Sequence, residues 1–132
     1  RAHARESSSR LRYVLAFGGG FVALVALALG VQLQRTGTSL SARWADVERA
    51  RAQVQNVKEK QQEVLTRLKD TEPSDARDAE VAGADNRVRI ERKRYDEAAS
   101  AYNAGVDGVL ARWAAKASGL PEEAALSSEV RW

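Results

Sequence analysis

The feature that most constrains this chain is a long stretch without charge near its N-terminus. From Tyr13 to Gln34 the sequence has no acidic or basic residue, and Ala, Val, Leu and Gly dominate it. These 22 residues would extend about 33 Å as a helix, enough to cross the hydrocarbon core of a bilayer. A chain of 132 residues is too short to surround such a helix, and the apolar part of a cleaved signal peptide is usually shorter, about 7–15 residues. The stretch predicts a membrane-spanning helix over residues 13–34.

Small residues lie along one side of this predicted span. At 3.6 residues per turn they fall within about 120° of one another. They are Ala16, Gly19, Gly20, Ala23, Ala26 and Gly30. Such a stripe lets a second helix approach closely, so we predict helix docking in the membrane here. Ordinary membrane-helix composition stays open as the alternative, because Leu27 interrupts the stripe.

The charges divide unevenly between the two sides of the span. Residues 1–12 form a basic tail with four arginines and one glutamate, whereas the other 120 residues hold 17 basic and 17 acidic groups. A neutral domain lacks the field that attracts nucleic-acid phosphates. A tail with four arginines is hard to translocate, while a long C-terminal domain can cross largely regardless of charge. We expect a single-pass protein of the bacterial inner membrane, with a cytoplasmic N-terminus and a periplasmic domain.

Residues 35–132 predict a helical hairpin domain. Apolar residues recur every seven positions in two segments, about 39–70 and about 86–117, and Pro73 lies between them. A break at residues 35–39 is expected to separate the first segment from the span. Two helices of similar length with one apolar stripe each should pack antiparallel. The predicted hairpin core consists of Val47, Val54, Val57, Val64, Val88, Tyr95, Tyr102 and Val109.

Matching the ends of the two segments predicts the register of the hairpin. Residue 40 then pairs with 117, so that Trp44 and Trp113 share a membrane-proximal base, and Tyr102 faces Val54. Because the seam is rich in Val and Ala, we expect modest burial and the need for a third partner helix.

Local signals predict the ends of the helices. Ser74 is the expected N-cap of the second helix and Gly119 its C-cap, and Pro121 should begin a short terminal helix. The fold class is therefore all-α, with one N-terminal transmembrane helix, a long antiparallel hairpin and a short C-terminal helix.

Residue types that support catalysis or metal binding are scarce. There is no cysteine, and the single histidine, His3, lies in the basic tail. Carboxylates such as Asp46 and Asp96 stand beside Arg or Lys at helical spacing, which surface pairing explains. The basic residues from Arg87 to Arg94 point around most of a helix, so they do not form one row for nucleic acid. We predict no enzymatic activity, no cofactor, no metal, no small-molecule substrate and no nucleic-acid partner.

Residues 85–106 contain a distinctive helix motif. It consists of Asn86-Arg87-Val88, of Arg92-Lys93-Arg94 before Tyr95, and of Ala98 followed by Tyr102-Asn103. This motif resembles the C-terminal signature helix of the LemA family of membrane-anchored helical proteins. Trp44-Ala-Asp-Val is similar to an early turn of the family, and Ser118-Gly119-Leu120-Pro121 to its ending, with Leu120 in place of an aromatic residue.

The resemblance implies an anchored helical fold with no established catalytic activity. Family members usually carry further helices between the positions that match Trp44 and Asn86. This chain would be a shortened member that lacks those middle helices.

Together these features predict a non-enzymatic membrane protein that acts as a structural scaffold or as an accessory subunit of a larger complex, for example a respiratory or photosynthetic one. The small-residue stripe and the thin hairpin core favour other membrane protein subunits, and membrane lipid, as partners. The alternative is a self-associating coiled coil that organises a membrane as a homo-oligomer. A third class, a binder of anionic lipid or nucleic acid, would differ by its sensitivity to salt.

Overall fold

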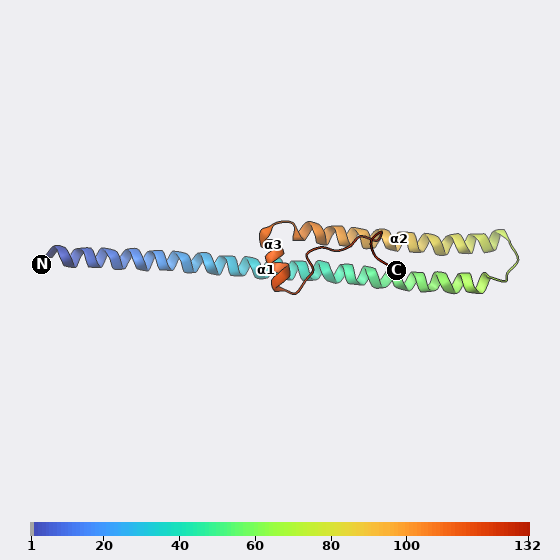
Figure 1. Ribbon diagram of the computed structural model, residues 1–132, viewed down its shortest axis with the longest axis horizontal. Helices are drawn as coiled ribbons and strands as arrows, with labels where there is room; N and C mark the ends of the chain where they lie inside the picture. The colour runs from blue at the N-terminus through green and yellow to red at the C-terminus, as the bar shows by residue number, and fades with distance from the viewer. Residues whose placement is uncertain (1) are drawn as a thin grey trace. The chain divides into compact units, whose positions relative to one another are not determined.

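The computed structural model describes the backbone of residues 2–132 and the side chains of residue 10 and residues 12–132. Over this range the chain forms no strand and three helices, which are α1 (Ala2–Leu68), α2 (Asp75–Val106) and α3 (Val109–Ala117) (Figure 1). The all-α fold class is therefore confirmed. The chain divides into two units, Arg1–Thr36 and Gly37–Trp132. The predicted basic tail falls outside the described side chains, apart from Arg10 and Arg12.

The first unit is the N-terminal part of α1. It contains the uncharged stretch, which within the described residues is the one helical segment long and apolar enough to cross a membrane. Side chains from Tyr13 to Gln32 are all exposed in the described structure.

The predicted break at residues 35–39 is wrong, since α1 is helical through these positions. Two hydroxyl groups in and just after this stretch bond within the helix. Thr36 Oγ1 donates to the carbonyl oxygen of Gln32, and Ser41 Oγ donates to that of Gly37, both at 2.9 Å. Serine and threonine can thus be accommodated in a helix by bonding to the carbonyl four residues earlier.

The second unit is built on an antiparallel pair formed by the C-terminal part of α1 and by α2 (Figure 1). A turn of residues 69–74 joins them. Ser74 caps α2 as predicted: its hydroxyl accepts a hydrogen bond from the Arg77 amide at 3.2 Å. The helix begins at Asp75, well before the predicted start near 86, because the cap and the acidic residues Asp75 and Asp78 stabilise its first turn.

The second predicted helix, about 86–117, is in fact two helices. α2 ends at Val106, and α3 begins at Val109 after a sharp turn. Gly108 has φ +109°, a backbone conformation that favours glycine. The dipeptide Asp107-Gly108 is a turn signal. It was missed because apolar residues continue to recur at every seventh position across it.

Gly119 ends α3 as predicted. It has φ +68°, and its amide donates to the carbonyl oxygen of Lys116 at 3.2 Å. The Leu120 amide donates to the carbonyl oxygen of Ala115 at 2.8 Å. These two bonds are the pattern of a Schellman cap.

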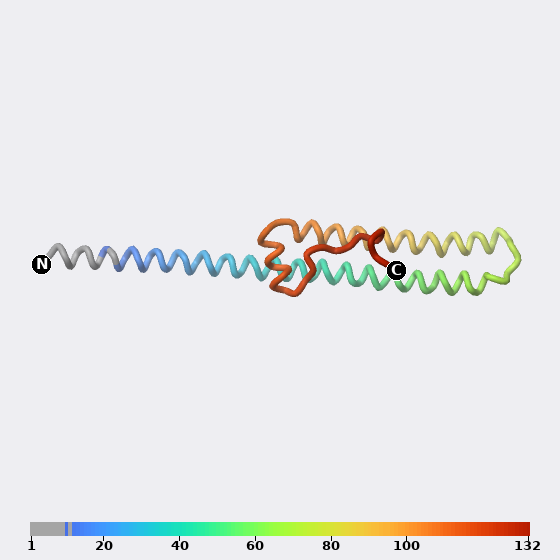
Figure 2. Tube along the Cα trace, viewed as in Figure 1, coloured from blue at the N-terminus to red at the C-terminus, as the bar shows by residue number. Residues whose placement is uncertain are grey.

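The predicted helix at Pro121 is wrong. Residues 120–132, called the terminal segment below, contain turns but no helix, and they run back along the hairpin (Figure 2). The short C-terminal helix of the fold is α3 instead.

The core of the second unit lies where α1, α2, α3 and the terminal segment meet. Its buried apolar residues are Leu40, Val47, Val54, Val88, Tyr95, Ala99, Tyr102, Val106, Ala114, Ala115 and Ala124. A third layer therefore covers the two-helix seam, but the chain's own terminal segment supplies it in place of the partner helix that we expected.

Candidate docking and clasp surfaces

The predicted docking stripe lies on open surface of the first unit. All six of its residues are exposed. A Cβ atom added at Gly19, Gly20 or Gly30 would meet no atom within 4 Å. The stripe is thus free to take up a neighbouring helix, and its binding role stays a prediction.

The hairpin has a different register from the predicted one. The Trp44 ring packs against Tyr102, with ring centroids 5.1 Å apart. The Arg43 guanidinium donates to the carbonyl oxygen of Ala101 at 2.9 Å, and Gln61 Nε2 donates to Asp85 Oδ1 at 2.6 Å. The predicted pairing of Trp44 with Trp113 is therefore wrong, and Trp113 is 70% exposed.

The error in register has a geometric cause. Trp113 lies eleven positions after Tyr102, the residue that Trp44 contacts. Eleven residues make about three turns of helix, so the same face of α2 meets α1 in both registers. The early start of α2 and the turn at Gly108 select the observed one.

Burial of the predicted core residues follows from this register. Val47, Val54, Val88, Tyr95 and Tyr102 are buried, and Val57 and Val64 are half-buried. Val109 does not belong to the core: it is 73% exposed, because the turn at Gly108 places it on α3. Six residues outside the predicted set are buried as well: Leu40, Ala99, Val106, Ala114, Ala115 and Ala124.

Side chains of α2 hold the terminal segment through paired hydrogen bonds. Asn103 Nδ2 donates to the carbonyl oxygen of Ala124 at 2.9 Å, and the Ala124 amide donates to Asn103 Oδ1 at 2.7 Å. About two helical turns earlier, Asp96 accepts from the amide and from the hydroxyl of Ser127, each at 2.6 Å. We call these contacts the clasp.

Two tyrosines of the core complete the clasp. Tyr95 donates its hydroxyl to the carbonyl oxygen of Ala125 at 2.7 Å, and Tyr102 donates its hydroxyl to that of Pro121. Burial raises the pKa of both hydroxyls above the ordinary 10.0; at Tyr95 the Arg51 charge opposes this effect, and Asp96 and Glu129 add to it. Both groups are therefore protonated donors at neutral pH.

The end of the terminal segment is held by Trp132. Its ring meets the ring of Tyr95 edge to face, with centroids 5.1 Å apart, and its Nε1 donates to the carbonyl oxygen of Ser127 at 3.0 Å. The clasp was missed in the sequence because the groups that bond to α2 are mostly backbone amides and carbonyls of a distant segment. The pair Tyr102-Asn103 in the helix motif was the one local sign of it.

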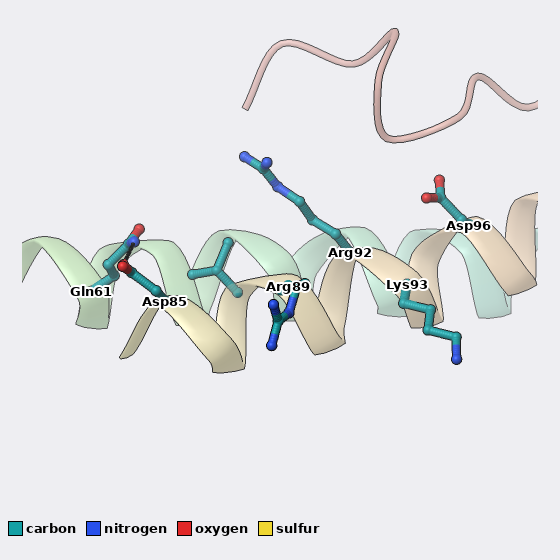
Figure 3. Close-up of a pocket in the computed structure, with 7 residues that line it drawn as sticks. Gln61, Asp85, Arg89, Arg92, Lys93 and Asp96 are labelled. Atoms are coloured by element: carbon teal, nitrogen blue, oxygen red, sulfur yellow. Dashed lines mark hydrogen bonds between the residues drawn. The ribbon is translucent and has the colours of Figure 1, made fainter. Parts of the chain in front are cut away.

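An open hollow of about 580 Å³ lies beside α2, lined in part by basic side chains. Figure 3 shows Asp85 turned toward Gln61, while Arg92 extends to one side of α2 and Arg89 and Lys93 to the other. The three cations diverge, so they do not form one binding surface for an anion.

Carboxylates of the described residues make surface pairs of the kind predicted. Asp46 pairs with Arg49 at 2.5 Å, and Glu91 with Arg94 at 2.9 Å. Asp96 differs, because it serves the clasp. In the part of the chain that the structure describes, no three His, Cys, Asp or Glu residues gather where a metal ion could bind.

The chain matches no protein-family model, and comparison with curated proteins and with solved structures gives no significant match.

Proposed function

We propose that this chain is a non-enzymatic single-pass membrane protein that acts as a structural scaffold or as an accessory subunit of a larger membrane complex. The observation that carries the proposal is the apolar segment of α1. It is long enough to cross a bilayer, and none of it is buried within the described structure. Such a surface requires a lipid or protein environment.

The contacts of the hairpin support a structural role over a chemical one. The polar groups at its centre, those of Asp96, Tyr102 and Asn103, all bond to the terminal segment. Since the terminal segment also covers the seam, the hairpin does not require a partner helix to complete its core. The stripe from Ala16 to Gly30 is then the better candidate for docking to another subunit.

We further propose the bacterial inner membrane as the location, with the N-terminus in the cytoplasm and the hairpin in the periplasm. Kinship with the LemA family, as a shortened member, is part of the same proposal. The helix motif of residues 85–106, which resembles the family's signature helix, is what supports it.

Self-association is the second candidate. A stripe of small residues can pack against its own copy, since two chains related by a twofold axis present the same surface to each other. A homo-oligomer of spans would make this chain a membrane organiser.

Purification of the tagged full chain in a mild detergent, followed by mass spectrometry of the co-eluting proteins, tests the proposal. Gly19→Leu places a large side chain on the stripe, and Gly18→Leu is its matched control, about 100° away around the helix. We expect the first variant to lose its co-eluting subunits at least tenfold while it stays in the membrane fraction, and the second to keep them.

Each other outcome has a definite meaning. Equal co-elution of both variants would contradict docking through the stripe. A further outcome is that the chain elutes only with copies of itself and that Gly19→Leu dissociates them. That result would favour the self-associating membrane organiser over the accessory subunit.

A further inference from the structure

Helix α3 has one face that the rest of the hairpin leaves uncovered. Ala114 and Ala115 are buried against the hairpin, whereas Val109 is 73%, Trp113 70% and Leu110 41% exposed. At 100° per residue these three exposed side chains lie within about 100° of one another. A helix of nine residues thus presents a small apolar patch with a tryptophan at its centre.

Two cations stand beside this patch. Arg112 and Lys116 are exposed and lie on the same side of Val109 around the helix. An apolar face flanked by basic residues is typical of helices that lie in the membrane–water interface. Arg112 also shares a hollow with Asp107, Glu122 and Glu123, which offset its charge. Apolar contact, and not attraction to anionic lipid, is then the main force available to this face.

The end of α3 lies against Gly37, the first residue of the second unit. A Cβ atom added at Gly37 would lie 2.9 Å from Ser118 Oγ, so the capping residue of α3 touches Gly37. Gly37 follows Gln34 by three residues, which reach at most about 10 Å. The C-terminal end of α3 therefore lies beside the residue at which the chain enters the second unit, three residues after the predicted end of the span.

The span lacks an aromatic residue at this end. Tyr13 stands at its N-terminal end, but no Phe, Trp or Tyr occurs from Val22 to Arg43. Tryptophan and tyrosine are enriched at both interfaces of membrane helices. Trp44 packs on Tyr102 and Trp132 on Tyr95, which leaves Trp113 as the tryptophan with an exposed ring among the described residues.

We propose that α3 is an interfacial helix, which lies in the headgroup layer of the bilayer with Val109, Leu110 and Trp113 inserted among the lipids. The inference rests on the proposed membrane span. It assigns to Trp113 the interfacial position that the span leaves without an aromatic residue. Contact of α3 with lipid would also restrict the rotation of the hairpin about its anchor.

Site-directed spin labelling of the full chain tests the inference, because the sequence has no native cysteine. Val109→Cys is the probe on α3. Ile90→Cys, 42% exposed on α2, is the control in water, and Phe21→Cys is the control in the span. Each labelled variant is reconstituted in phosphatidylcholine vesicles with and without phosphatidylglycerol, and collision rates with oxygen and with a water-soluble nickel chelate are compared.

Lipid insertion predicts that the ratio of oxygen to nickel collisions at position 109 is several-fold higher than at position 90, in both lipid mixtures. Adding Trp113→Glu to the Val109→Cys variant should lower this ratio to that of the water control, whereas Trp113→Phe should leave it high.

Failure of this inference is distinguishable from failure of the proposed function. A water-exposed label at 109 with a lipid-exposed label at 21 would overturn the interfacial helix alone. A label at 109 that neither reagent reaches would overturn it too, since protein would then cover α3. A water-exposed label at 21 would overturn the span, and the proposed function with it.

Discussion

The ring of Trp44 on α1 packs against the ring of Tyr102 on α2, with centroids 5.1 Å apart and planes tilted by 60°. Tyr102 is fully buried and also donates its hydroxyl to Pro121 of the terminal segment. One side chain thus joins three parts of the hairpin. Tilted aromatic pairs of this kind contribute about 0.5–1.5 kcal/mol beyond their buried area.

The register defined by this contact can be tested with cysteine pairs. It places Val47 opposite Ala99, and both are buried. We expect Val47→Cys with Ala99→Cys to form a disulfide within one chain under mild oxidation, because facing seam residues approach the roughly 4–7 Å Cα separation that the bond requires. Mobility on a non-reducing gel measures the cross-link.

The matched control is Val54→Cys with Tyr102→Cys, the pair that end-matching of the sequence would favour. It should stay reduced. Cross-linking of this pair in preference to the first would show that the hairpin adopts the other register.

The clasp should contribute measurably to stability. Asn103→Ala removes two hydrogen bonds and leaves the amide and carbonyl of Ala124 without their partner. We expect the free energy of unfolding to fall by about 1–3 kcal/mol. Asn86→Ala, which removes a surface bond to Arg89, should change it by no more than about 0.5 kcal/mol. Urea unfolding of the detergent-solubilised chain, followed by tryptophan fluorescence, compares the two; equal losses would argue against the clasp.

The raised pKa values of Tyr95 and Tyr102 predict that the folded chain loses stability at high pH. The pKa values of Tyr95 and Tyr102 are raised above 10.0 in the folded chain, so the unfolded chain releases these protons first. Their contribution is fully present below pH 10 and declines as pH rises from there through the folded pKa values. The variant with Tyr95→Phe and Tyr102→Phe should lose part of the decline in unfolding free energy that occurs as the pH rises above 10. An unchanged slope in that variant would contradict the assignment.

The orientation can be tested with a reporter that is active only outside the cytoplasm. Fused after Trp132, it should be active if the N-terminus is cytoplasmic as proposed, since arginine-rich tails tend to stay on the cytoplasmic side. Replacing Arg10 and Arg12 with Glu should reduce that activity, because it removes positive charge from the N-terminal side of the span. Activity from a cytoplasm-only reporter at the same position would reverse the proposed topology.

Features that depend on near neighbours in the chain could be predicted from the sequence. The absence of charge from Tyr13 to Gln34 indicates an apolar helix by itself. The recurrence of apolar residues at every seventh position identifies the helix faces that carry Val47, Val54, Tyr95 and Tyr102. The caps at Ser74 and Gly119 act on backbone groups within a few residues of them. Each of these depends on local geometry that any helix would share.

Features that depend on distant parts of the chain were decided by tertiary structure. A shift of eleven residues is about three helical turns, so the apolar pattern fits both registers and cannot tell Tyr102 from Trp113 as the partner of Trp44. The terminal segment is not helical because Asp96 and Asn103, on another element, satisfy backbone groups that a helix would otherwise pair. Hydrogen bonds between segments about 20–30 residues apart leave no periodic trace in the sequence.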